Sequence, residues 1–419
     1  MTAADLPTLA VVYGDGSAPA MSLTAAAAPL CDIAWVVDSS ATRDASTLRL
    51  LRKLGTVIDL AGLSEQEAAA AVRVQRPDGI VAYADAQIGI AAGLAEILGL
   101  DYYERSVAAG LLDKVVQRQA LGDGGLAVPR CVVVPSDPLP EDVDAVAAMV
   151  KFPVVLKPRH GAASRETHLA ANAAQLRALV EQLPDGSAAP DMVVEEFMAD
   201  PSEHPSPWFG DYVSVESVVA GGQVSHLAVT GRLPGAKPFR ETGLIIPSDF
   251  TQSLQLSILN MASEAIAALG IRTGCLHTEI KVTDDGPRII EVNGRIGGFV
   301  APVLALASPG IDFFQISQRI ALGERVVFPD LVSTPHVGYV TVGQPPIGAH
   351  RVVSVAGLDK VAAYPGVDSV SLNRRPGDEV DWRLGSHEYV YAVLGHAPDH
   401  DAVRAMQGYV DEEIEVVYE

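Results

Sequence analysis

Residues 276–296 carry the pattern that decides the fold, and they read LHTEIKVTDDGPRIIEVNGRI. Polar and apolar residues alternate on both sides of the turn at residues 284–287, which predicts two antiparallel strands joined as a hairpin. Because side chains alternate between the faces of a strand, the first strand would present His277, Glu279 and Lys281 on one face.

The second strand of this hairpin would present Glu291, Asn293 and Arg295 on one face. If the hairpin is symmetric about Asp285, Glu279 lies directly opposite Glu291. Two facing carboxylates repel unless one is protonated or a cation lies between them. Mg²⁺ suits this position, because one or two carboxylates typically hold it together with nucleotide phosphates, and an Asn oxygen can complete the set. The other interpretation is the solvated polar face of a surface hairpin.

A lysine at the end of an apolar strand is the second informative feature. Residues 152–158 read FPVVLKP, and a loop of small and basic residues, 159–165, follows them and contains Ser164. A lysine such as Lys157 can neutralise a phosphate, and small loop residues let backbone N–H groups approach its oxygens. The alternative is a strand end followed by an ordinary surface loop.

The third feature is an apolar strand that ends in acids and large side chains. Residues 192–198 read MVVEEFM. Such a segment can hold an adenine through backbone hydrogen bonds while Phe197 and Met198 pack against the ring. Packing of both side chains in the protein core is the alternative.

These three elements, in this order, resemble the ATP-grasp superfamily over residues 111–323. Residues 239–242 (FRET), 277–281 (HTEIK) and the Glu291 to Gly298 stretch look most like the L-amino-acid ligases that make dipeptides, including the alanine–anticapsin ligase of bacilysin synthesis. One departure is Leu244, which stands where that ligase has a histidine.

The resemblance implies a role for each candidate residue. Those expected at ATP are Lys114, Lys157, Ser164, Glu195, Glu196, Phe197, Met198 and Glu203. The expected ligands of Mg²⁺, or of Mn²⁺ in its place, are Glu279, Glu291 and Asn293. Arg295 would bind the acyl or carboxylate group, Gly298 would offer its backbone N–H nearby, and Glu241 would hold the ammonium of an amino-acid substrate.

The activity that the resemblance implies is ATP-dependent ligation of a carboxylate to an amine through an acyl phosphate, with release of ADP and phosphate. Two alternatives remain open. One is an ATP-grasp ligase or carboxylase that acts on a carboxylate other than an amino acid. The other is a catalytically silent nucleotide-binding protein, although adenine binding alone needs neither the paired carboxylates nor Arg295.

The fold class that we expect is α/β. In the first hundred residues short apolar runs alternate with helical stretches, which predicts βαβ units and a parallel sheet. The resemblance implies a Rossmann-like pre-ATP-grasp domain at residues 1–105, a small ATP-grasp lobe at 106–190, a large lobe with the metal and substrate site at 191–330, and a small α+β C-terminal subdomain at 331–419. In that last part we expect strands at 337–342 and 388–394.

The amino-acid composition limits the classes of molecule that this protein is expected to bind. The formal net charge of -22 argues against nucleic acid and anionic membranes as partners, because both attract basic surfaces. Three cysteines at wide spacings fit neither a disulfide framework nor a zinc site. The start of the chain lacks the basic and apolar regions of a signal peptide, so we expect a cytoplasmic protein that acts on small molecules. A homodimer is one option for its assembly.

Overall fold

The computed structural model describes residues 6–41, 45–135, 138–183, 191–203, 205–206, 208–210, 212–328 and 331–419. These residues form an α/β protein with sheets of four, four, eight and two strands. None of the helices in these ranges combines the length and the apolar character needed to cross a membrane.

The N-terminal unit is a parallel sheet with the strand order β3-β2-β1-β4. Its strands are β1 (Thr8–Tyr13), β2 (Asp32–Val37), β3 (Thr56–Asp59) and β4 (Gly79–Ala82). Its helices are α1 (Ala20–Ala27), α2 (Ala45–Leu54), α3 (Glu65–Arg73) and α4 (Asp85–Leu98). Successive strands are added on one side of β1 up to β3, and β4 is then added on its other side, so a topological switch point lies between β1 and β4. In open α/β sheets, ligands bind beyond the carboxyl ends of the strands at such a point.

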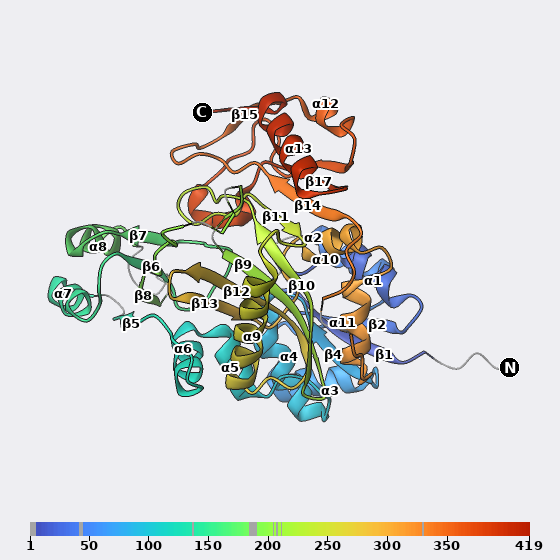
Figure 1. Ribbon diagram of the computed structural model, residues 1–419. Helices are drawn as coiled ribbons and strands as arrows, with labels where there is room; N and C mark the ends of the chain where they lie inside the picture. Colours follow the sequence, from blue (N-terminus) through green and yellow to red (C-terminus); the bar gives the residue numbers. More distant parts are fainter. Residues whose placement is uncertain are drawn as a thin grey trace.

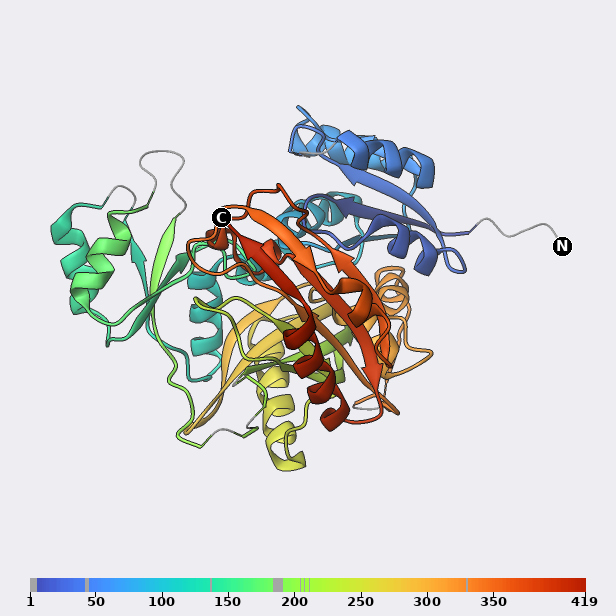
Figure 2. The same ribbon diagram turned by 90° about the horizontal axis from the view of Figure 1, so that it is seen from above.

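A small lobe follows two connecting helices and stands away from the N-terminal sheet in both ribbon views (Figures 1 and 2). The connecting helices are α5 (Arg105–Leu112) and α6 (Lys114–Asp123). The antiparallel sheet of the lobe has the order β5-β8-β6-β7. Its elements are β5 (Cys131–Val134), α7 (Pro140–Ala148), β6 (Val154–Pro158), β7 (His168–Ala170), α8 (Ala173–Val180) and β8 (Met192–Glu196).

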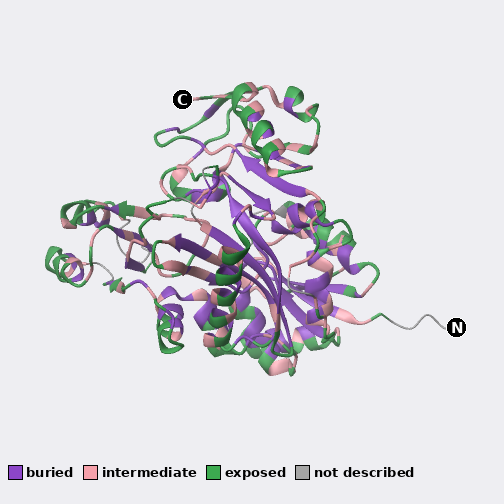
Figure 3. Cartoon of the chain, in the orientation of Figure 1, coloured by how far each residue is buried: buried purple, intermediate pink, exposed green. Residues whose placement is uncertain are grey.

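The largest sheet has eight strands in the order β13-β12-β9-β10-β11-β14-β17-β16. Its first five strands in the chain are β9 (Tyr212–Ala220), β10 (Gln223–Arg232), β11 (Gly243–Ile246), β12 (Gly274–Thr283) and β13 (Gly286–Asn293). The helices between and after them are α9 (Gln252–Ala268), α10 (Val300–Ala307) and α11 (Phe313–Ala321). Burial is most continuous along these central strands, while the outer helix faces are exposed (Figure 3).

The C-terminal elements extend the same sheet, because β14 pairs with β11. They are β14 (Val337–Val342), β15 (Val352–Ala356), α12 (Leu358–Ala362), β16 (Val367–Leu372), η2 (Trp382–Glu388), β17 (Tyr391–Ala397), α13 (His400–Glu413) and β18 (Glu415–Tyr418). The predicted strand at 388–394 is therefore wrong at its start, since Glu388 ends a 3₁₀ helix. Pairing of β17 with β16 begins at Tyr391 and with β14 at Ala392, and the buried Glu388 carboxylate instead accepts a hydrogen bond from Arg374 at 2.6 Å.

A side-chain cap fixes the start of α6, which carries the candidate ATP-binding residue Lys114. The Asp113 carboxylate accepts hydrogen bonds from the N–H groups of Val115 and Val116, at 2.9 and 3.4 Å. The same carboxylate is held by the Arg159 guanidinium, with 2.6 Å between Nη2 and Oδ2. Lys114 thus stands in the first turn of a capped helix that is tied to the loop after β6.

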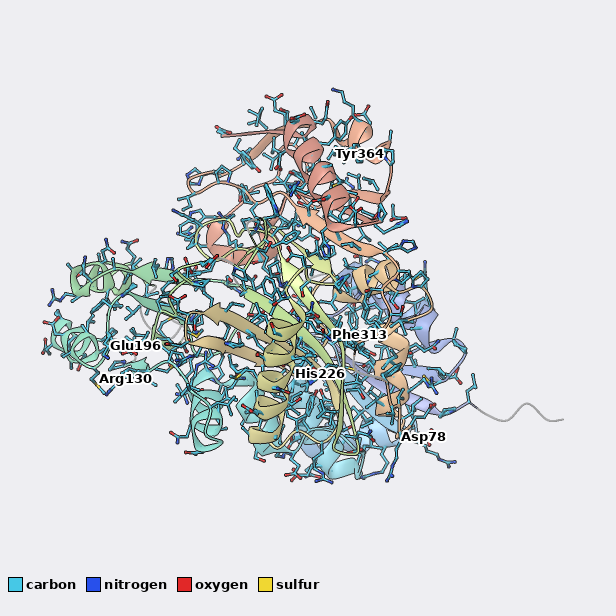
Figure 4. The ribbon with its side chains drawn as sticks, viewed as in Figure 1. Asp78, Arg130, Glu196, His226, Phe313 and Tyr364 are labelled. Atoms are coloured by element: carbon cyan, nitrogen blue, oxygen red, sulfur yellow. The ribbon has the colours of Figure 1, made fainter. Side chains whose placement is uncertain are left out.

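Two large cores hold these layers together. One lies between the N-terminal helices, α9 and one face of the large sheet, and the other lies under α1, α10 and α11 on its opposite face. His226 belongs to β10 and lies at the centre of the molecule near α9 (Figure 4), where its Nε2 is 2.8 Å from Ser263 Oγ. In the same view Arg130 and Glu196 mark the small lobe, joined by the Glu196 N–H donating to the Arg130 carbonyl at 2.9 Å.

Candidate active site

The predicted hairpin is present, and Glu279 of β12 pairs with Glu291 of β13. The predicted partner is right, but symmetry about the turn is not the reason. Near the turn Thr283 pairs with Gly286, and that register would not bring the two carboxylates opposite each other. A β-bulge after Glu279 inserts one residue into β13 and corrects the register. Bulges of this kind redirect side chains, and this one makes the two glutamates face each other.

Each of these two carboxylates lies within 4 Å of a cationic side chain. Glu279 Oε1 lies 3.5 Å from His277 Nε2, and Glu291 Oε1 lies 3.1 Å from Lys114 Nζ. In the described parts of the chain, no group of three or more His, Cys, Asp or Glu side chains is arranged to hold a metal. A facing pair of carboxylates nevertheless fits Mg²⁺, which takes one or two protein carboxylates and completes its shell with phosphates and water. Asn293 is buried, and its Nδ2 donates to the carbonyl of His277 at 3.3 Å.

His277 lies between Glu279 and a second, completely buried carboxylate, that of Glu216 on β9. Its Nδ1 is 3.0 Å from Glu216 Oε2. Burial alone would lower the pKa of His277, but the Glu216 carboxylate outweighs burial and raises this pKa to about 9. The imidazolium in turn lowers the pKa of Glu279 to about 2 against the effect of burial, so Glu279 is ionised and ready for a cation.

The candidate ammonium ligand Glu241 is held by one of its two oxygens. Its Oε1 lies 2.9 Å from Nη1 of Arg232 and accepts a hydrogen bond from the Tyr212 hydroxyl at 3.0 Å. The Glu241 N–H donates to Ser386 Oγ at 2.9 Å, which anchors the backbone. Since about a third of the Glu241 side chain is exposed, the carboxylate can still receive a cation from solvent.

Arg295 follows β13 and forms an ion pair with Asp85, which lies in the N-terminal unit. Its Nε and Nη2 donate to Asp85 Oδ2 at 3.2 and 3.0 Å. The other oxygen of this carboxylate, Oδ1, is buried and accepts no hydrogen bond from the residues that the structure describes. Asp85 begins α4, directly beyond the carboxyl end of β4 at the switch point of the parallel sheet. Sequence reasoning missed this residue, although an acid just after the strand at 79–83 is a recognisable signal.

The loop after Arg295 is shaped by glycines and by strain. A side chain at Gly297 would meet the His277 ring at 2.5 Å, whereas the space around Gly298 is open. Phe299 adopts φ +58° at the start of α10, a conformation that costs a non-glycine residue about 1–3 kcal/mol and is typical of functional sites. The open surroundings of Gly298 are compatible with the predicted use of its N–H.

A buried ion-pair cluster joins the two predicted ATP-binding segments. Glu195 on β8 accepts hydrogen bonds from Lys157 Nζ at 3.0 Å and from Nε and Nη2 of Arg118 at 2.9 and 3.0 Å. Burial would raise the pKa of Glu195, but the two cations lower it to about 2. The structure thus brings Lys157 and Glu195 together and adds Arg118, which sequence reasoning did not select.

The other residues predicted at the adenine lie around the end of β8. The Glu196 carboxylate accepts a hydrogen bond from the N–H of Lys151 at 2.8 Å. The Phe197 ring lies 5.4 Å from Lys281 Nζ and 6.2 Å from the Phe239 ring. The backbone N–H of Phe197 donates to the Pro153 carbonyl at 3.0 Å, so this N–H is already used within the protein.

Met198 and Glu203 continue from this strand towards the tip of the hairpin. Met198 is partly buried and Glu203 is exposed. The neighbouring Ser202 donates from its N–H to Asp284 at 2.8 Å, in the turn between β12 and β13. The segment therefore runs alongside the hairpin that carries the facing glutamates.

The loop at 159–165 touches two distant parts of the chain. Lys114 Nζ donates to the Gly161 carbonyl at 2.9 Å, and Ser164 Oγ donates to the Phe239 carbonyl at 2.6 Å. The Ser386 N–H donates to the Ala163 carbonyl at 2.8 Å. Loop, large sheet and C-terminal segment therefore meet at one edge of the site, a meeting that no local sequence pattern reveals.

The chain carries an ATP-grasp domain, since residues 150–303 match the model of that domain. The whole chain also has the ATP-grasp fold, as predicted from the sequence. The crystal structure of an L-amino acid ligase from Bacillus licheniformis superposes with a TM-score of 0.76, covering 99% of this chain and 100% of that one at 20% identity.

Several curated relatives are named as a synthase or a ligase. Carnosine synthase 1 of Homo sapiens is 28% identical over 275 residues, which are 60% of this chain and 31% of that protein. D-alanine--D-alanine ligase of Cupriavidus metallidurans is 29% identical over 234 residues, which are 54% of this chain and 68% of that protein. The chain spans between 14% and 58% of the length of the first relatives that it matches.

Proposed function

We propose that this protein is an ATP-dependent ligase that joins the carboxylate of an amino acid to the amine of a second amino acid and releases ADP and phosphate. The observation that carries the proposal is a pair of opposite charges beside the facing glutamates. Arg295 suits a carboxylate or an oxyanion, and Glu241 suits an ammonium. The relatives named as ligases of D-alanine and of L-amino acids support the same substrate class.

The proposed reaction begins with activation of the carboxylate. A carboxylate does not condense with an amine in water, because oxide is a poor leaving group. Transfer of the γ-phosphoryl group of ATP gives an acyl phosphate, whose leaving group is good. Such a transfer needs positioning and charge neutralisation more than covalent help, and Lys114, Lys157 and Arg295 would supply positive charge. Mg²⁺ held by Glu279 and Glu291 would neutralise further phosphate charge.

In the second half of the reaction the amine attacks the acyl carbon, and a tetrahedral oxyanion forms. Arg295 is always charged and can donate two hydrogen bonds in a fork, which suits this oxyanion. Glu241 would hold the ammonium of an incoming amino acid and accept the proton that it loses before the attack, and collapse of the oxyanion would expel phosphate. Asp85 would orient Arg295, because its Oδ2 accepts hydrogen bonds from both Nε and Nη2 of that residue.

A panel of amino acids, tested singly and in pairs with ATP and Mg²⁺, tests the proposal. We expect ADP and phosphate to appear in equal amounts only with productive pairs, and mass spectrometry to show the dipeptide. Stimulation by one carboxylic acid with simple amines would instead indicate a broader ligase. No ADP release with any member of the panel would leave the proposal wrong.

A lid over the site is part of the proposal, because water would destroy an acyl phosphate. The contact between the loop at 159–165 and Gly385 supports it. Gly385 has φ +81°, and a Cβ there would lie 2.1 Å from the Ala163 carbonyl oxygen. We expect Gly385→Ala to push the loop away and to increase ADP release without product, measured as the ratio of ADP to dipeptide.

Gly377→Ala is the matched control for this prediction. Gly377 has φ +97° in the same C-terminal part, but nothing lies within 4 Å of its Cβ position. Both substitutions strain the backbone, and only that at Gly385 displaces the loop. An equal ratio of ADP to dipeptide in both variants would show that the contact with the loop does not exclude water.

A further inference from the structure

A continuous buried network connects the candidate ammonium ligand with a candidate metal ligand. It runs from Glu241 to Arg232, then through Ser214 and Glu216 to His277, and ends at Glu279. The two ends are partly exposed, with 35% and 24% of the Glu241 and Glu279 side chains accessible. The middle is closed, since only 2% of the Arg232 side chain and 5% of the His277 side chain are accessible.

Arg232 is the branch point of this network. Its Nη1 lies 2.9 Å from Glu241 Oε1, and its Nη2 donates to Ser214 Oγ at 2.9 Å. The same Nη2 lies 3.1 Å from His277 Nε2. Because a guanidinium is planar and rigid, its bonds to Glu241 and Ser214 fix its own position, and the bond from Ser214 to Glu216 carries this constraint to the His277 ring.

Glu216 holds the other side of the network. It is completely buried on β9 and accepts hydrogen bonds from Ser214 Oγ at 2.7 Å and from Thr230 Oγ1 at 3.0 Å. It also holds His277 Nδ1 at 3.0 Å, so the ring cannot rotate away from Glu279. Both Glu216 oxygens are therefore used, whereas Arg232 Nε is buried without a hydrogen-bond partner among the described residues, so the two Nη groups alone hold Arg232 in the network.

The charges of the network favour added cations. Glu216, Glu241 and Glu279 are three carboxylates, and Arg232 is the permanent cation among them. The residual negative charge lies at the two exposed ends. A metal ion at Glu279 and an ammonium at Glu241 would each add the positive charge that the buried middle lacks.

We infer that Arg232 is a positioning residue that sets the amine site at Glu241 and the metal site at Glu279 relative to each other. This inference rests on the proposed function for the role of Glu241. It goes further in making the geometry of both sites depend on one buried side chain that contacts neither substrate nor metal.

Arg232→Lys tests the inference, because it keeps the charge and removes the fork. A lysine cannot reach Glu241, Ser214 and the His277 edge together. We expect the KM for the amine to rise about tenfold, the effect of losing a hydrogen bond to a charged group. We also expect Mn²⁺ to bind several times more weakly in the presence of ADP, measured by electron paramagnetic resonance without turnover.

Tyr212→Phe is the matched comparison. It removes the other hydrogen bond to Glu241 Oε1 and leaves Arg232 and His277 in contact. We expect this variant to raise the KM for the amine with no change in Mn²⁺ binding. A rise in both quantities for Arg232→Lys and in only the first for Tyr212→Phe is the pattern that the network requires.

The outcomes separate the inference from the proposed function. If no amino-acid pair makes the wild-type protein release ADP, the proposed function fails, and the Mn²⁺ titration alone decides about Arg232. If Arg232→Lys changes amine KM and Mn²⁺ binding less than twofold while thermal unfolding shifts, Arg232 has only a structural role and the inference is overturned. If it changes one quantity and not the other, the two sites are not connected, and the inference is equally wrong.

Discussion

The Glu195→Gln variant should lose about 3–5 kcal/mol of its free energy of unfolding, the usual cost of removing one partner from a buried ion pair. Glu195 is 3% exposed and is the shared partner of Lys157 and Arg118. A glutamine keeps the volume but leaves two buried cations without a counterion. Urea unfolding followed by circular dichroism measures the loss.

The pH dependence of this loss has a definite sign. The pKa of Glu195 is lowered from 4.5 to about 2 in the folded protein. A group with a lowered pKa stabilises the fold above its unfolded value, and this stabilisation, about 3 kcal/mol for such a shift, disappears as the pH falls through the folded value. The difference between wild type and Glu195→Gln should therefore be full above pH 4.5 and shrink towards pH 2.

Glu196→Gln is the control for both measurements. Glu196 is the next residue on β8, but its carboxylate accepts a hydrogen bond from the backbone N–H of Lys151 and forms no ion pair in the described residues. We expect a change in the free energy of unfolding of less than about 1 kcal/mol, as for most exposed or partly exposed positions. A loss as large as that of Glu195→Gln would show that the strand end, and not the ion pair, is sensitive.

Local patterns predicted the parts of the site that lie on single strands. Alternation in residues 276–296 identifies both strands of the hairpin and the face that carries Glu279 and Glu291. The bulge that aligns them is not readable, because it depends on how β12 pairs simultaneously with β9 and β13. The prediction that Glu279 faces Glu291 was therefore correct, although it assumed a hairpin symmetric about Asp285, and the actual hairpin contains a bulge.

The sequence could not show which residues from distant segments would meet in the site. Asp85 meets Arg295 across 210 positions, and only the packing of the parallel sheet against the large sheet brings them together. Glu216 and Arg232 lie inside strands that are otherwise buried. The alternation of Ser214 and Glu216 with valines was a usable signal, since polar residues on one face of a buried strand need partners there.

The Arg295→Met variant should lose about 10²–10³ of kcat, the effect of removing a donor from an oxyanion site. Arg295 lies near the Glu279 and Glu291 carboxylates, whose negative charge favours its cationic form. Asp85 orients the Arg295 guanidinium through a hydrogen bond. The KM for ATP should change little, because Lys114 and Lys157 remain. Single-turnover measurement of ADP formation, with nucleotide affinity measured separately, distinguishes the two quantities.

The substitution also leaves Asp85 without its cation, so a loss of stability must be separated from a loss of chemistry. The double variant Asp85→Asn, Arg295→Met removes both charges and should recover part of the thermal stability while kcat stays low. Arg288→Met on the preceding strand β13, where the side chain lies 3.4 Å from the exposed Asp285, should leave kcat unchanged. If the double variant regained kcat along with stability, Arg295 would be a structural partner of Asp85, and the oxyanion would need another donor.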